Sequence, residues 1–286
     1  MSAAEYSSLA PDARVELRAF LAGTDRWALV RGESLALLTH LPSACVDAVV
    51  TDGPYSSGGQ FRGDRASGTG SKYIGTDARK VDGAEDRRVD FEGDSRDQLS
   101  FGLWAALWMG ECHRVAKPGA IGGFWTDWRQ LAATIGALQA GGWVYRGVWC
   151  WDKTEGVRPQ LGRPRNQCEF VVWGSRGPMP ATRAGGNVEP GVVRCASTMA
   201  SKRGHQTGKP DPCNRLWARL CDAGGVLLDP FAGSASMADA CIEEGRRYLG
   251  FEVVDRIHAE AHARLVAREG GALERGRGAQ MTIPGA

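Results

Sequence analysis

The 286-residue chain carries 35 Lys and Arg residues against 33 Asp and Glu residues, a formal net charge of only +2. Its hydrophobic content of 43% is enough for one large α/β core. The sequence has no apolar run that could cross a bilayer, and its N-terminus is too polar for a secretory signal, so we expect a cytoplasmic protein without membrane contact. Its eight cysteines lack zinc-ligand spacing and Cys-x-x-Cys pairs, which argues against a metal site and against a disulfide framework.

The first elements are a short helix within residues 1–25, a strand from Trp27 to Arg31, and an amphipathic stretch that Pro42 ends. Glu33 comes just after the strand. An acid at this place can accept hydrogen bonds from the amino group of a bound adenine, and it is equally favoured in the first turn of a helix. We keep Glu33 as a candidate cofactor ligand.

Residues 46–59, VDAVVTDGPYSSGG, read as a buried strand that ends at Asp52 and breaks into Gly53, Pro54 and Tyr55. Such a strand brings these residues to the sheet edge where α/β enzymes bind ligands. If the substrate is an amino-bearing nucleobase, Asp52 and the Gly53 carbonyl can accept its two amine hydrogens. Pro54 then stiffens the turn, and Tyr55 stacks on the flipped base. The alternative is an ordinary turn with Tyr55 in the core.

Residues 56–96 are rich in glycine and charge, with little apolar periodicity, so we expect a flexible loop that closes over DNA or contacts a partner subunit. The pattern then predicts helices and strands in the following order: a helix over 98–115, a strand over 120–125, a helix over 127–140, and strands over 143–151 and 168–173.

A basic segment runs from Lys153 to Lys209, with ten Lys or Arg residues, three Glu and no Asp. This distribution suits a phosphate-contacting surface, although a solvated charged loop would have the same composition. Residues 175–205 lack a clear element and are predicted to be an irregular recognition segment. The candidate DNA contacts are Lys153, Arg158, Arg163, Arg165, Arg183, Lys202 and Arg203.

The last third predicts a strand, a turn and a helix in VLLDPFAGSASMADACIEEG, residues 226–245. The strand ends at Asp229, the helix starts near Ser234, and Gly233 lets the backbone approach a ligand. A second strand ends at Glu252, where a β-α-β unit places the acid that binds ribose hydroxyls. We therefore expect an adenosine-binding half, followed by a frayed tail over 270–286.

Several of these motifs, taken together, resemble the β class of DNA amino-methyltransferases, which use S-adenosylmethionine. They are GES (32–34), TDGPY (51–55), HRVAKPG (113–119), KP (209–210, after His205) and DPFAGS (229–234). The resemblance extends from about residue 27 to about residue 268. The linear order of the motifs is more specific than any one of them.

The resemblance implies one methyltransferase domain over 1–286, with a Rossmann-like, mixed, mostly parallel sheet flanked by helices and an inserted irregular target-recognition region. The catalytic half would be 26–174, the recognition segment 175–205 and the cofactor half 206–268. Asp52, Pro54 and Tyr55 match the catalytic motif, and Glu252 matches the ribose acid. The other cofactor positions implied by the resemblance are Lys209, Pro210, Asp229, Phe231, Gly233 and Ser234.

Three positions depart from the family pattern. Gly53 replaces the first of two prolines, Ala235 replaces a glycine, and Glu33 replaces an aspartate. The acid at 52 favours adenine N6 as the methyl acceptor, because the cytosine-N4 enzymes of this class more often have serine at that position. Cytosine N4 is the alternative acceptor. The resemblance implies double-stranded DNA as substrate, a homodimer and no metal. It leaves open whether a restriction partner exists.

Three rival interpretations explain less. A nicotinamide-dependent dehydrogenase would need Gly-x-Gly-x-x-Gly, which the turn after Asp229 lacks. A cytosine C5 methyltransferase would need a cysteine nucleophile, but Cys213 precedes the cofactor strand and does not follow the catalytic one. A catalytically weak DNA-binding relative remains the alternative of another class, and it would have no reason to keep Asp52 together with an adenosine site.

Overall fold

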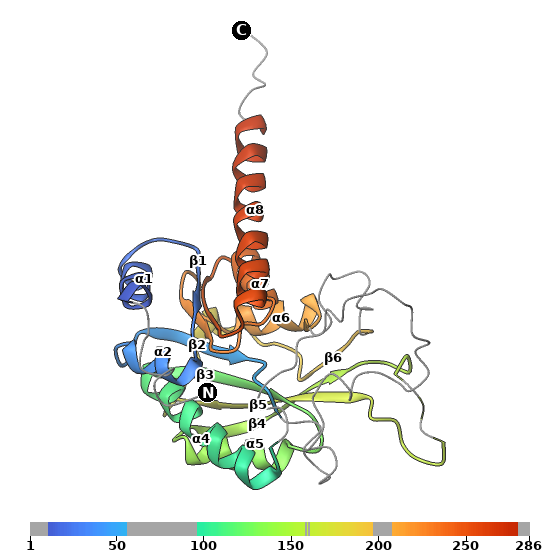
Figure 1. Cartoon of the computed structure of the whole chain (residues 1–286). Helices are drawn as coiled ribbons and strands as arrows, with labels where there is room; N and C mark the ends of the chain where they lie inside the picture. Colours follow the sequence, from blue (N-terminus) through green and yellow to red (C-terminus); the bar gives the residue numbers. More distant parts are fainter. Residues whose placement is uncertain (1–10, 56–95, 158, 160, 197–207, 280–286) are drawn as a thin grey trace, which may run out of the picture.

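The computed structural model describes residues 11–55, 96–157, 159, 161–196 and 208–279. In these residues, eight strands form one sheet with the order β1-β8-β7-β2-β3-β5-β4-β6 (Figure 1). The strands are β1 (Trp27–Arg31), β2 (Val46–Thr51), β3 (Ala116–Thr126), β4 (Val144–Asp152), β5 (Cys168–Ser175), β6 (Val192–Arg194), β7 (Val226–Asp229) and β8 (Arg247–Glu252).

Helices cover both faces of the sheet (Figure 1). One face carries α1 (Pro11–Ala22), α2 (Ser34–His40), α4 (Gln98–Val115) and α5 (Leu131–Ala140), and the other carries α6 (Asp211–Arg219), α7 (Ser236–Glu243) and α8 (Asp255–Ala279). A 3₁₀ turn, η2 (Arg183–Gly186), lies between β5 and β6.

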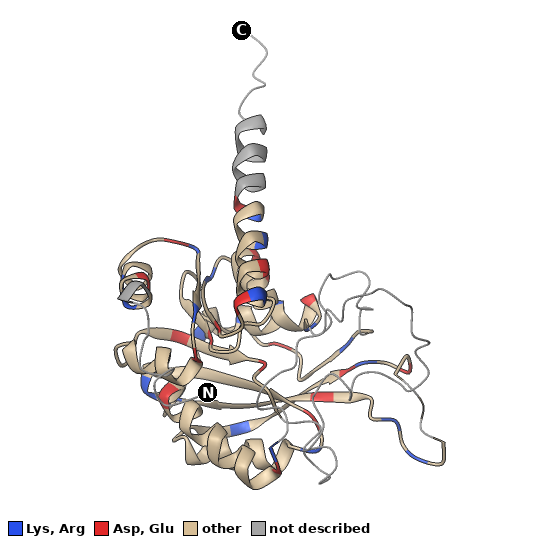
Figure 2. Cartoon of the chain, viewed as in Figure 1, with Lys and Arg blue, Asp and Glu red and all other residues tan. Residues whose placement is uncertain are grey.

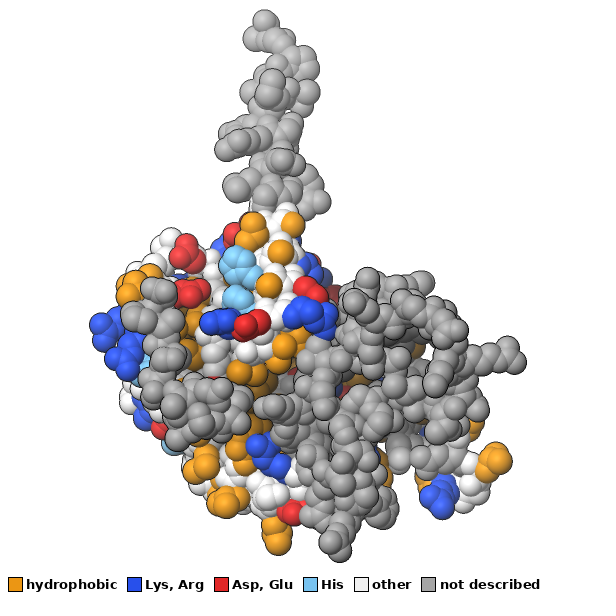
Figure 3. Space-filling view, viewed as in Figure 1, with side chains coloured by type: hydrophobic (Ala, Val, Ile, Leu, Met, Phe, Trp, Pro, Cys, Tyr) orange, Lys and Arg blue, Asp and Glu red, His pale blue; other side chains and the backbone are white. Residues whose placement is uncertain are grey.

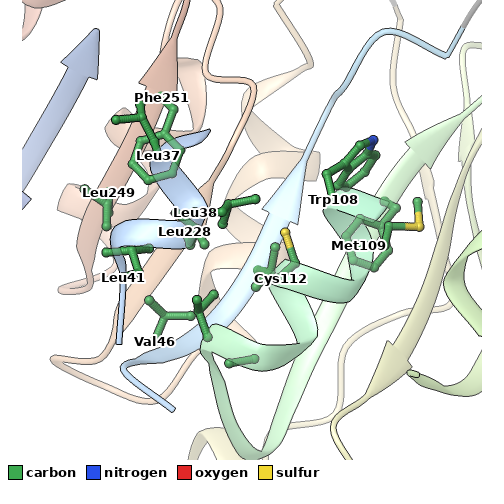
Figure 4. Close-up of a cluster of buried hydrophobic side chains, with 14 of the residues drawn as sticks. Leu37, Leu38, Leu41, Val46, Trp108, Met109, Cys112, Leu228, Leu249 and Phe251 are labelled. Atoms are coloured by element: carbon green, nitrogen blue, oxygen red, sulfur yellow. The ribbon is translucent and has the colours of Figure 1, made fainter. Parts of the chain in front are cut away.

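The two-sided burial follows from alternation along the strands. In β3, Phe124 joins the core cluster under α4, whereas Trp125 joins the cluster under α6 and α7. Figure 4 shows the first cluster, to which α4 contributes Trp108, Met109 and Cys112 and β2 contributes Val46. A strand buried on both faces carries apolar residues at nearly every position, as VDAVVT does.

Strands β1, β8, β7, β2 and β3 run parallel, and β5 pairs antiparallel with β3. β4 pairs antiparallel with β5, and β6 runs parallel to β4. From β2 the chain continues to β3 on one side, and it returns later as β7 on the other side. The order therefore reverses between β2 and β7, and such a switch point is where open α/β sheets bind ligands. The predicted mixed, mostly parallel fold is confirmed.

Some predicted boundaries were wrong. The helix predicted over 127–140 begins at Leu131, because the Asp127 carboxylate accepts the backbone N–H groups of Arg129 and Gln130 in a turn. The predicted irregular segment contains η2 and β6. Helix α8 continues to Ala279, past the predicted start of the tail at 270. The predicted loop over 56–96 lies outside the described residues, except for Arg96. In the part of the chain that the structure describes, no helix could span a membrane.

Candidate active site

The ends of β2 and β7 meet directly. The two strands are paired through Ala48 with Leu227 and Val49 with Leu228. One step further, the Thr51 hydroxyl donates a 2.6 Å hydrogen bond to Asp229 Oδ1, and the Phe231 backbone N–H donates to Thr51 Oγ1 at 3.2 Å. Thr51 thus joins the predicted catalytic turn to the predicted cofactor turn. Sequence analysis missed this role.

Asp229 is a buried carboxyl at this junction. The Tyr248 hydroxyl donates to its Oδ2 at 3.2 Å, opposite the bond from Thr51. Burial raises the pKa of Asp229 to about 7, although these hydrogen bonds act in the opposite direction. Asp229 therefore titrates near neutral pH, and it supports the turn through its hydrogen bonds.

Gly53 lies against the cofactor turn. A Cβ atom at this position would come within 2.9 Å of Phe231 Cδ2, closer than ordinary packing allows. Phe231 is fixed from behind by the rings of Trp104 and Trp108, whose centroids lie 5.7 and 5.0 Å from its own. The departure from the two-proline motif is therefore matched by packing, because the Phe231 ring occupies the space next to Gly53 and the Gly53 carbonyl is retained.

Lys209 lies at the catalytic turn. Its Nζ is 3.0 Å from Asp52 Oδ2 and 3.0 Å from Glu169 Oε2, and it lies 5.5 Å from the centroid of the Tyr55 ring. The resemblance implied a cofactor role for Lys209, whereas these contacts join it to Asp52. Pro210, the next residue, is buried at the start of α6.

Glu169, at the start of β5, is a second charged residue that sequence analysis missed. It binds Lys209 and also accepts a hydrogen bond from Lys153 Nζ at 3.1 Å. Burial alone would raise the pKa of Glu169, but the two ammonium groups outweigh burial and lower it. For the Lys209 ammonium, burial alone would lower the pKa. Asp52, Tyr55 and Glu169 outweigh burial and raise the pKa of Lys209 well above its usual value. The available signal was an acid inside an otherwise apolar strand, CEFVVW.

The predicted ribose acid and the glycine turn also come together. Glu252 Oε2 accepts the Gly233 backbone N–H at 2.9 Å, and Oε1 accepts that of Val254 at 2.8 Å. Burial raises the pKa of Glu252, while these N–H groups oppose the shift. Gly233 has φ +51°, and a Cβ there would meet nothing within 4 Å, so the space above the turn is open. An acid beside open space and a glycine turn fits the adenosine part of S-adenosylmethionine.

Glu33 caps helix α2. Its Oε2 accepts the backbone N–H of Ala36 at 2.8 Å, which is the helix-start role that the sequence left open. The preceding residue, Gly32, donates its N–H to the Glu252 carbonyl at 3.0 Å, and Ser34 donates its hydroxyl to the Pro230 carbonyl. Glu33 is therefore held at the same edge of the sheet as the cofactor turn. Ser234 lies in that turn, and its carbonyl accepts from Arg264 at 2.9 Å.

The candidate DNA contacts differ in exposure and in their partners. Arg163 and Arg165 are exposed on the loop that joins β4 to β5, where Figure 2 shows basic residues in blue. Lys153 is held by Glu169. Arg158, Lys202 and Arg203 lie outside the described residues.

Arg183, another candidate DNA contact, lies away from the candidate active site. Its side chain is only 11% exposed, lies 3.6 Å from Asp222, and donates to the backbone carbonyl of Asp47 near the start of β2. That end of the sheet is opposite Asp52. These contacts fasten η2 to the sheet, and the role of Arg183 in binding DNA stays a prediction.

Comparison with known proteins agrees with this geometry. Residues 46–263 match the family model of the N6/N4 DNA methylases. The chain therefore belongs to the N6/N4 DNA methylase family. A similar protein is the putative methylase YubD of Escherichia coli (strain K12), 25% identical over 239 residues, which are 83% of this chain and 89% of that protein.

Two solved structures have a similar fold. PvuII DNA methyltransferase, described as cytosine-N4-specific, matches with a TM-score of 0.59 at 14% identity over 83% of this chain and 86% of that one. The M1.HpyAVI complex with S-adenosylmethionine matches with a TM-score of 0.56 at 15% identity over 84% of this chain and 98% of that one. The family is S-adenosylmethionine-dependent, in agreement with the predicted cofactor.

Proposed function

We propose that this protein transfers a methyl group from S-adenosylmethionine to the exocyclic N6 of a flipped adenine in double-stranded DNA. The observation that carries the proposal is the Thr51–Asp229 hydrogen bond of 2.6 Å. It holds the turn that begins with Asp52 against the turn that leads to Gly233, so an amine at the first can meet a methyl donor at the second. A DNA-binding relative without catalysis would not need this junction.

The roles of the residues follow from the chemistry of the amine. Its lone pair is delocalised into the base and becomes nucleophilic only when acceptors draw its hydrogens out of the ring plane. Asp52 and the Gly53 carbonyl are the proposed acceptors, and Tyr55 is the proposed stacking ring. When bound, S-adenosylmethionine supplies an electrophilic methyl group on a sulfonium. The nitrogen–carbon bond forms while the sulfur–carbon bond breaks, sulfur keeps the electron pair, and nitrogen loses one proton.

The base and the activity can be tested together. Plasmid DNA incubated with the protein and S-adenosylmethionine is digested to nucleosides, and N6-methyladenine and N4-methylcytosine are quantified by mass spectrometry. We expect N6-methyladenine. N4-methylcytosine alone would favour the alternative base. If neither product forms while calorimetry shows cofactor binding, the DNA-binding relative is favoured.

A homodimer is also part of the proposal. Leu99, Leu103 and Leu107 are spaced four residues apart on α4 and are 87%, 72% and 56% exposed. In Figure 3, hydrophobic atoms gather at the lower edge of the molecule, where Figure 1 places α4 and α5. An exposed apolar stripe can bury itself against its own copy across a two-fold axis. Sedimentation of Leu103→Glu beside the parent chain tests this. We expect the parent chain to sediment as a dimer and Leu103→Glu to sediment as a monomer. A monomeric parent chain would contradict the homodimer.

A further inference from the structure

Four charged side chains form a continuous series along the edge of the sheet at the candidate active site. Asp52 is 3.0 Å from Lys209, Lys209 is 3.0 Å from Glu169, and Glu169 is 3.1 Å from Lys153. These residues come from the end of β2, the segment before α6, the start of β5 and the end of β4. Their charges alternate, so the series is neutral as a whole.

Lys209 is the enclosed member of this series. Its side chain is only 9% exposed, and its Nζ lies 5.0 Å from the centroid of the Trp125 ring and 5.5 Å from that of Tyr55. A buried ammonium is costly unless it is well paired. Glu169 and the two rings therefore hold Lys209 in place, and Lys209 in turn contacts Asp52.

We propose that Lys209, anchored by Glu169, is a positioning residue that keeps the Asp52 carboxylate ionised and oriented toward the amine of the target base. The inference rests on the proposed function and names how that site is supported. An ammonium next to Asp52 disfavours its protonation. Asp52 then acts as a hydrogen-bond acceptor, and the proton released by the methylated nitrogen leaves to water.

Removal of the ammonium gives a distinctive result. In Lys209→Met, Asp52 and Glu169 lose the ammonium between them, while Lys153 remains 3.1 Å from Glu169. Asp52 then lies beside a carboxylate without the cation that favoured its charged form, and we expect it to retain its proton to higher pH. The other ionisable groups in this environment are Tyr55, Asp229 and, facing Tyr55 from the end of β3, Asp127. We expect the acid limb of the kcat–pH profile to move upward by roughly 1–3 pH units. At neutral pH, kcat should fall by about 10²-fold because the acceptor is misplaced.

Three further variants isolate the cause. Lys209→Met with Glu169→Gln removes the competing carboxylate and should return the acid limb toward its original position. Lys209→Arg keeps the charge and should retain more activity than Lys209→Met. Lys117→Met is the matched control, because Lys117 lies 2.7 Å from Asp47 in a Lys–Asp pair near the other end of β2. We expect this control to leave the pH profile unchanged.

The proposal is overturned if Lys209→Met leaves kcat and its pH dependence unchanged. It is also overturned if that variant raises only the dissociation constant of S-adenosylmethionine, which would return Lys209 to a cofactor role. Failure of the methylation proposal is recognised separately. A double-mutant cycle on unfolding with Asp52→Asn and Lys209→Met reports their coupling without any turnover. If the cycle shows coupling but the parent chain methylates no base, the Asp52–Lys209 ion pair is supported and the proposed methylation is rejected.

Discussion

Strand β2 has an aspartate–lysine pair near each end, and the two pairs serve different purposes. Near the start of β2, Asp47 binds Lys117 at 2.7 Å and accepts the backbone N–H of Val226 at 2.9 Å, which fastens β7 beside β2. Its lysine is 45% exposed. At the end of β2, Asp52 binds the enclosed Lys209, which is itself anchored by Glu169. The same two residue types therefore fasten the sheet at one end and lie at the proposed active site at the other, which is the edge where open α/β sheets bind ligands.

The sharpest way to test this contrast is to change the two aspartates separately. Asp52→Ala should nearly abolish methyl transfer, with kcat reduced by roughly 10²-fold to 10³-fold because the amine loses an acceptor at a preorganised site. The dissociation constant of the cofactor, measured by calorimetry, should stay within a few-fold. Asp47→Asn should show the reverse pattern, with kcat retained and the free energy of unfolding lowered by about 1–3 kcal/mol. Methylation by Asp52→Ala at the parent rate would remove the distinction.

A smaller loss is expected from Gly53→Ala. The added Cβ would lie 2.9 Å from Phe231, so either the turn or the ring must shift. We expect kcat to fall by about 10-fold to 10²-fold, on the scale of a displacement of about 1 Å. Gly53→Ala combined with Phe231→Leu provides room and should recover part of the loss. Equal rates for Gly53→Ala and the parent protein would show that the contact does not constrain the turn.

The pH dependence of stability provides a third test at the functional end. The pKa of Asp229 is about 7 in the folded protein, against an ordinary value of 3.8. Its contribution to stability is therefore fully present below pH 3.8 and is lost as pH rises through 7. Urea unfolding of the parent and of Asp229→Asn should differ in slope against pH across this window. Parallel curves would mean that Asp229 does not titrate there.

The smallest effect is expected at the start of β2. Lys117→Met removes a half-exposed partner of Asp47, and ion pairs near the surface contribute about 0–1 kcal/mol. The melting temperature should change by no more than a few degrees, and kcat should be unchanged. A large loss of activity in this variant would show that the two ends of β2 are coupled.

The sequence was most informative where the residues of a motif are contiguous. The strand VDAVVT with its turn, and VLLD with its glycine turn, could be predicted because the strand, the turn and the candidate site residues follow one another in the chain. The contact of Lys209 with Asp52 could not be predicted, because it depends on where the segment before α6 crosses the ends of β2 and β5. The surroundings of Arg183 could not be predicted for a related reason. A basic composition does not indicate which guanidinium faces solvent and which one binds a buried carbonyl.

The contact between Gly53 and Phe231 also limits how such enzymes can be recombined. One residue belongs to the N-terminal portion and the other to the C-terminal portion, and each fits the shape of its neighbour. In a chimera that joins this N-terminal portion to the C-terminal portion of a relative, the residue at the position of Phe231 must leave Gly53 the same space. Laboratory shuffling, like natural exchange of segments, should therefore succeed most often when both turns come from one parent.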